Sequence, residues 1–139
     1  MNRIQFWLYL TLLISACKPK NSDNSIILNP NTHSFSNLEK VTTTHLNWDA
    51  QINFDLKQVS GTATWNFKNP SKEKYIHFDT YDLTIKKVKV NGKETQYFLT
   101  PFIENYGSGL SIPLTQKDTI LSIEYVTGVN ANALQWLSP

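Results

Sequence analysis

The chain has 139 residues, of which 40% are apolar and 12% aromatic, a composition typical of a globular domain and not of a disordered segment. Its 13 basic and 11 acidic side chains give a formal charge of +2, too small to indicate a phosphate-binding patch, so we expect no nucleic-acid partner. The single cysteine, Cys17, excludes an intrachain disulfide.

Residues 1–16 have the three-part layout of a secretory signal. A basic start at Arg3 precedes the apolar stretch Ile4–Ile14, which is shorter than the roughly 20 residues of a membrane-spanning helix. Ile14-Ser15-Ala16-Cys17 resembles the lipobox of bacterial lipoproteins, which implies lipid attachment at Cys17. We therefore expect an exported chain, anchored by lipid in the bacterial cell envelope. An ordinary signal peptide with an incidental cysteine is the alternative.

Residues 17–37 are predicted to be the lipidated cysteine followed by a flexible tether. The stretch is rich in Asn, Ser and Pro, and such a composition buries too little apolar surface to offset the entropy lost on ordering. Ile26–Leu28 is its only apolar cluster. That cluster could instead dock as an edge strand.

From His45 onward, apolar and polar residues alternate over a dozen positions, which predicts a long strand with one buried and one solvent-facing side. We expect Gly61 to mark the turn into the returning strand. Several aromatic side chains fall on the predicted buried faces, and we assign them to the core: Trp48, Phe54, Trp65 and Phe67.

The next segments also have the pattern of strands. Asn91-Gly92 is the strongest local hairpin signal, because both turn positions favour positive φ. Asp79–Asp82 is expected to be a turn, and Gly107–Gly109 a flexible loop. The expected strands are Tyr75–Phe78, Leu83–Val90, Glu94–Leu99, Leu110–Leu114 and Ile120–Thr127. We therefore predict an all-β domain over residues 38–139, a sandwich or curved sheet of seven or eight strands.

No residues suggest a catalytic or metal-binding site. His33, His45 and His77 have no metal-ligand spacing. No helix follows the Gly-Ser-Gly loop, so it is not a nucleophile elbow. Asp79 and Asp82 could form an acid/base pair, but carboxylates in turns more often accept hydrogen bonds from nearby backbone amides, and we favour that role.

Two stretches resemble a single family. Phe78-Asp79-Thr80-Tyr81-Asp82-Leu83-Thr84-Ile85, continuing to Glu94, and the closing Ala133-Leu134-Gln135-Trp136-Leu137-Ser138-Pro139 resemble the amino-terminal domain of leukotriene hydrolase-type zinc aminopeptidases of the aminopeptidase N superfamily. The match spans residues 44–139. It implies a saddle-shaped β domain packed against a thermolysin-like catalytic domain. The family's zinc-binding His-Glu-x-x-His and its Gly-x-Met-Glu-Asn loop do not occur in this sequence.

The resemblance implies a non-catalytic β domain of an envelope zinc aminopeptidase that acts on peptides. Zinc would belong to the catalytic domain of the same parent, and this chain would hold no cofactor. The sequence ends on an apolar run, so we expect the domain to be truncated there and take four residues as candidates for the interface with the catalytic domain: Leu134, Gln135, Trp136 and Leu137. The alternative is a self-contained lipoprotein β-sandwich that binds a peptide or protein partner.

Overall fold

The computed structural model describes residues 26–137, so the predicted signal segment and Cys17 lie outside the described residues. This part of the chain contains eight strands and no helix, which confirms the all-β prediction. The strands are β1 (Thr42–Asn53), β2 (Gln58–Lys68), β3 (Tyr75–Thr80), β4 (Leu83–Val90), β5 (Lys93–Glu94), β6 (Phe98–Leu99), β7 (Ser108–Pro113) and β8 (Ile120–Thr127). Within residues 26–137 there is no helix long and apolar enough to cross a membrane.

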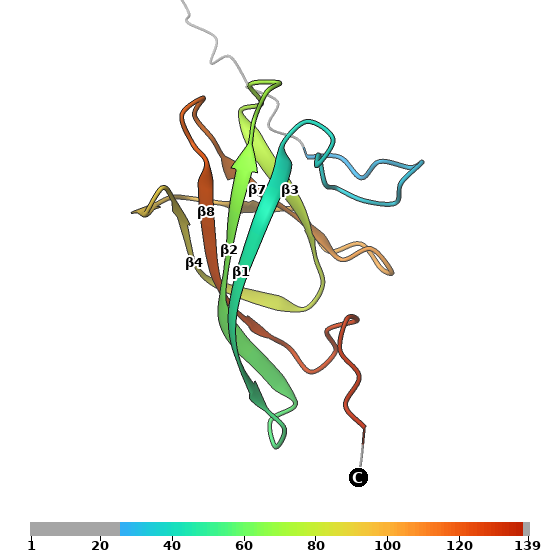
Figure 1. Ribbon diagram of the computed structural model, residues 1–139. Coiled ribbons are helices and arrows are strands. Elements are labelled where there is room, and N and C mark those ends of the chain that lie inside the picture. Colours follow the sequence, from blue (N-terminus) through green and yellow to red (C-terminus); the bar gives the residue numbers. More distant parts are fainter. Residues whose placement is uncertain (1–25, 138–139) are drawn as a thin grey trace, which may run out of the picture.

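The strands form two antiparallel sheets. The larger has five strands in the order β1-β2-β8-β4-β5, and the smaller has three in the order β3-β7-β6. Figure 1 shows β1 and β2 as a long hairpin, with its turn at the lower end, near the segment that follows β8. The smaller sheet lies towards the opposite end of this hairpin. Part of the larger sheet therefore extends beyond the smaller one.

The β1–β2 turn lies at Phe54–Lys57, so the prediction of a turn at Gly61 was wrong. Asn53 Oδ1 accepts a hydrogen bond from the Leu56 amide at 2.9 Å, and Lys57 has φ of 48°. Gly61 lies inside β2, opposite Ala50. A Cβ atom at Gly61 would lie 2.8 Å from the Ala50 Cα, so this glycine permits a close approach of two strands.

Asn91-Gly92 forms the predicted hairpin turn, with φ of 48° and 79°. The Asn91 Oδ1 also accepts hydrogen bonds from the amides of Thr119 and Ile120, which ties this turn to the start of β8. The expected partner strand Glu94–Leu99 is divided between the sheets. Lys93–Glu94 pairs with β4, whereas Phe98–Leu99 pairs with β7.

Two of the predicted loops are shorter in the structure, because the neighbouring strands extend into them. β3 continues through Asp79 to Thr80, so only the end of the expected Asp79–Asp82 turn is a turn, and Asp82 has φ of 51°. The expected Gly107–Gly109 loop becomes strand at Ser108, which pairs with Thr80. Pairing between β3 and β7 therefore extends both strands.

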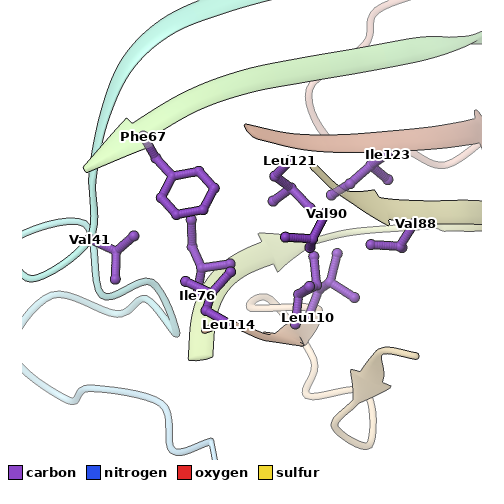
Figure 2. Close-up of a cluster of buried hydrophobic side chains, with 10 residues drawn as sticks. Val41, Phe67, Ile76, Val88, Val90, Leu110, Leu114, Leu121 and Ile123 are labelled. Atoms are coloured by element: carbon purple, nitrogen blue, oxygen red, sulfur yellow. The ribbon is translucent and has the colours of Figure 1, made fainter. Parts of the chain in front are cut away.

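The hydrophobic core lies between the two sheets. Figure 2 shows how side chains from β2, β4 and β8 meet side chains from β3 and β7. The buried cluster consists of Val41, Phe67, Ile76, Val88, Val90, Leu110, Ile112, Leu114, Leu121 and Ile123. The assignment of Phe67 to the core is confirmed, and Trp65 is partly buried against the cluster. Each fully buried side chain of this kind contributes about 1.5–3 kcal/mol of transfer free energy.

Residues 34–37 pack onto the smaller sheet. Phe35 is 4% exposed, and a Cβ atom at Gly109 would lie 2.8 Å from its ring. The Asn37 side chain donates to the Tyr75 carbonyl at 3.0 Å and accepts from the His77 amide at 2.9 Å, so it bonds the edge of β3 as a strand would. Ile26–Leu28, the segment that could have docked as an edge strand, forms no strand.

Candidate functional site: an apolar groove beside strand β1

The apolar side chains of β1 are exposed. Leu46, Trp48 and Ile52 are 51%, 57% and 56% exposed, and Phe54 in the following turn is 75% exposed. The assignment of Trp48 and Phe54 to the core was therefore wrong. The alternation correctly placed the β1 residues on one face of a strand, but nothing in the described part of the chain packs fully over them.

The register of the larger sheet explains this exposure. Trp48 lies opposite Ala63, Ala63 opposite Ile123, and Ile123 opposite Val88, so these four residues form one row across the same face. Ala63, Ile123 and Val88 are buried, whereas Trp48 is not. The smaller sheet thus covers the row from β4 to β2 and leaves β1 uncovered.

An apolar groove of about 640 Å³ lies along the boundary between the covered and uncovered parts. Its side chains come from both sheets and from residues 131–134, which follow β8. Trp65 of β2 and Phe78 of β3 meet at its floor, with their ring centroids 5.1 Å apart. Trp48 donates from Nε1 to the Tyr125 hydroxyl at 2.5 Å across its wall. Such a surface binds by shape and apolar contact.

The structure places one of the four predicted interface residues, Leu134, in the lining of the groove. Trp136 instead meets the ring of Phe54, in the turn after β1, edge-on, with the centroids 6.0 Å apart. Gln135 is exposed, and Leu137 is 87% exposed. The Trp136 Nε1 atom is buried without a hydrogen-bond partner among the described residues. Leu134 therefore lies near the apolar side chains of β1, and Trp136 lies against the turn that follows β1.

The three histidines are not brought together. His33 lies beside Tyr106, His45 is exposed on β1, and His77 lies half-buried in β3. Burial lowers the pKa of His77; Lys40 lowers it further, and Glu73 opposes both. Within residues 26–137, no three His, Cys, Asp or Glu side chains gather where they could hold a metal ion. The described residues therefore do not fit a zinc site.

Asp79 and Asp82 accept hydrogen bonds from backbone amides, but not from the nearby amides that the sequence led us to expect. Asp79 accepts from the Phe35 amide at 2.7 Å and from the Ser34 hydroxyl at 2.6 Å. Asp82 accepts from the Asn130 amide at 2.9 Å. The donors lie far along the chain, so these carboxylates hold separate segments together rather than a local turn.

A second, polar hollow of about 350 Å³ lies on the opposite face of the larger sheet. Asp49, Lys86 and Glu124 are among the residues that line it. No sequence motif marks this hollow. The apolar groove is foreshadowed in the sequence by the alternation of apolar residues in β1, the outermost strand. The sequence alone did not show which part of the apolar face is left uncovered.

Comparisons with known proteins agree with the fold. No family model matches the chain. Leucine aminopeptidase 2 of Coccidioides immitis is 35% identical over 117 residues, which is 79% of this chain and 19% of that protein. Yeast LTA4 hydrolase, solved in complex with bestatin, superimposes with a TM-score of 0.65 and 22% identity over 81% of this chain and 18% of that one.

An M1 zinc metallopeptidase from Deinococcus radiodurans superimposes with a TM-score of 0.54 and 13% identity over 64% of this chain and 21% of that one. The chain therefore spans about a fifth of the length of the proteins it matches. The resemblance to aminopeptidases seen in the sequence is confirmed. The chain is similar in sequence to leucine aminopeptidase 2 and has the fold of the amino-terminal β domain of LTA4 hydrolase and the M1 metallopeptidases.

Proposed function

We propose that this chain is the non-catalytic amino-terminal β domain of a zinc aminopeptidase that removes amino-terminal residues from peptides. The observation that carries the proposal is the 35% identity to leucine aminopeptidase 2 over 79% of the chain. Residues 26–137 have no cluster of metal ligands, so in this proposal zinc and hydrolysis belong to a catalytic domain of the same parent protein.

The apolar surface gives the domain a role in that parent. Exposed apolar patches of this kind usually mark an interaction site. In our proposal the groove and the run of Leu134, Gln135, Trp136 and Leu137 contact the catalytic domain. The β domain would then orient that domain and shape one wall of the substrate cleft without taking part in the chemistry.

The gene sequence tests the proposal directly. We expect the reading frame to continue past codon 139 into a segment with a His-Glu-x-x-His helix and a more distant glutamate, the zinc-binding set of such enzymes. The complete product should hydrolyse leucine p-nitroanilide and lose this activity to a chelator. A stop codon at this position with no such segment downstream would contradict the proposal.

We also propose that the chain is exported and held at the bacterial cell envelope by lipid on Cys17. The apolar stretch Ile4–Ile14 and the lipobox-like Ile14-Ser15-Ala16-Cys17 support this. Two or more acyl chains anchor a protein stably, whereas one binds only marginally. Labelled palmitate should enter the chain in cells, and Cys17→Ser should abolish the label. Labelling that persists in Cys17→Ser would contradict lipidation at this residue.

The groove also favours a second candidate, a self-contained lipoprotein module that holds a peptide or protein partner. An extended apolar segment would fit beside β1, where Leu46 and Trp48 are exposed. The two functions differ in what the gene encodes. A stop codon after codon 139, together with saturable binding of an extended apolar peptide by the purified chain, would favour the module.

A further inference from the structure

The turn after β4 contains the only asparagine of the chain that is followed by a glycine, Asn91-Gly92. This dipeptide is prone to deamidation, because glycine has no side chain to hinder attack by its own backbone nitrogen. The nitrogen of Gly92 bonds to Cγ of Asn91, and the amide group leaves as ammonia together with the proton of that nitrogen. Water then opens the resulting succinimide to aspartate or isoaspartate. The turn is therefore a candidate site of chemical modification.

The side chain of Asn91 is held by the loop between β7 and β8. Its Oδ1 accepts from the amides of Thr119 at 3.2 Å and Ile120 at 3.1 Å. Its Nδ2 donates to the Asp118 Oδ1 at 3.1 Å and to the Lys117 carbonyl at 3.4 Å. Both ends of the side-chain amide thus have partners. These bonds join described residues to one another, so they do not depend on whether further chain covers this end of the domain.

The backbone of the turn is fixed as well. Asn91 and Gly92 have φ of 48° and 79°, and the Asn91 amide donates to the Ile120 carbonyl at 2.8 Å. Val90 pairs with Lys93 directly beside the turn. Succinimide formation requires the Gly92 nitrogen to reach Cγ of Asn91, which means rotating the side chain and the peptide bond between the two residues. Hydrogen bonds on both must break first, and their loss adds to the barrier.

We propose that Asn91 is a deamidation site that the folded domain protects and that unfolding exposes. The protecting element is the β7–β8 loop, which binds the oxygen and the nitrogen of the Asn91 side chain. Separation of β4 from β8 releases both atoms. The proposal concerns this turn alone and is independent of the proposed function.

The modified side chain cannot restore the same contacts. An aspartate at position 91 has no N–H to donate, so its carboxylate would face the Asp118 carboxylate where Nδ2 now donates. Isoaspartate also adds one backbone atom to a two-residue turn. A chain that is deamidated while unfolded should therefore refold to a less stable state, and it should unfold again more often.

Peptide mapping by mass spectrometry tests the protection. The full chain is kept at neutral pH, either folded in buffer or unfolded in guanidinium chloride, and the conversion of Asn91 is followed with time. We expect conversion to be at least tenfold slower in the folded chain, which corresponds to about 1.4 kcal/mol of activation free energy. Equal rates, or no conversion of Asn91 in the unfolded chain, would overturn the proposal.

Two variants in the β7–β8 loop test which contacts protect Asn91. Asp118→Ala removes one acceptor of Nδ2 and should speed conversion in the folded chain at least threefold. Lys117→Ala is the matched control, because it removes a neighbouring charge but keeps the backbone carbonyl that accepts from Nδ2. Circular dichroism verifies that both stay folded. A folded Asp118→Ala that converts no faster than Lys117→Ala would overturn the role of the loop.

A third variant, Asn91→Asp, reproduces the simplest product. It should unfold at a lower guanidinium chloride concentration than the parent chain, and Asn91→Asp/Asp118→Asn should recover part of the loss, because one of the two facing charges is removed. Unfolding of Asn91→Asp at the same concentration as the parent would overturn the proposed destabilisation. The comparison of folded and unfolded parent chain does not depend on any variant.

Discussion

Asp79 joins two parts of the chain that are 44 residues apart in sequence. Its carboxylate accepts from the backbone of Phe35 and from the hydroxyl of Ser34, and Phe35 then fills the space above Gly109. Hydrogen bonds to a charged acceptor are stronger than neutral ones, and losing one from a part-buried amide costs about 1–3 kcal/mol. A single carboxylate thus holds Ser34 and Phe35 against the smaller sheet.

His77 gives stability a dependence on pH. Its Nδ1 atom is buried with no hydrogen-bond partner among the described residues, so a proton on Nδ1 would have no acceptor there. Burial, the largest cause, lowers the pKa of His77 below its usual 6.5. The unfolded chain therefore binds this proton more readily than the folded one, and stability rises with pH over the window below about 6.5.

We expect the free energy of unfolding to fall as pH is lowered from 7.5 to 5, and His77→Gln to make this fall shallower. Glutamine stays neutral over the whole range, so the variant removes the linked proton. Urea denaturation at several pH values measures the difference. If the parent and His77→Gln lose the same stability between pH 7.5 and 5, the contribution of His77 is refuted.

At the scale of elements, local sequence predicted the strands better than it predicted their burial. Ile120–Thr127 and Leu83–Val90 were placed correctly because alternation and the Asn91-Gly92 turn are local signals. The division of the Glu94–Leu99 segment was not visible, since it depends on which sheet each half meets. The turn at Phe54–Lys57 was missed because Gly61 carries a stronger turn signal, although that glycine serves a close strand contact.

The groove, too, could not be predicted from local sequence patterns. Alternation establishes that Leu46 and Trp48 share one face of β1, and the strand register places Ala63 and Ile123 on the same face of the sheet. Whether such a face is buried depends on the width of the second layer. That width is set by long-range pairing between β3 and β7, which no pattern within β1 can report.

The difference in burial between the aromatic side chains of β1 and β2 can be tested by mutation. Phe67→Ala removes a ring that is 2% exposed and should lower the free energy of unfolding by about 3–5 kcal/mol. Trp48→Ser removes a ring that is 57% exposed, together with one hydrogen bond, and should cost at most about 1 kcal/mol. Urea denaturation at low protein concentration compares them. Equal costs would mean that Trp48 belongs to the core after all.

The groove is a property of the whole molecule. Its floor joins the two sheets through Trp65 and Phe78, and one wall is the chain that follows β8. No single element could form it. Because the smaller sheet has three strands and the larger five, the apolar face of the larger sheet exceeds what residues 26–137 cover. The same excess supports a docking role inside a longer aminopeptidase.

A dye that binds exposed apolar surface should therefore bind the folded chain. We expect anilinonaphthalene sulfonate to fluoresce with the native protein, and Trp48→Asp or Leu134→Asp to reduce this fluorescence by more than half, because each places a charge in the groove. Gln51→Asp is the matched control, since exposed Gln51 lies on the opposite face beside the polar hollow and should leave the fluorescence unchanged. Circular dichroism would verify that all three variants stay folded. If folded Trp48→Asp and Leu134→Asp bind the dye as strongly as Gln51→Asp does, the groove is not the apolar surface that the dye detects, and its role as a docking site loses its basis.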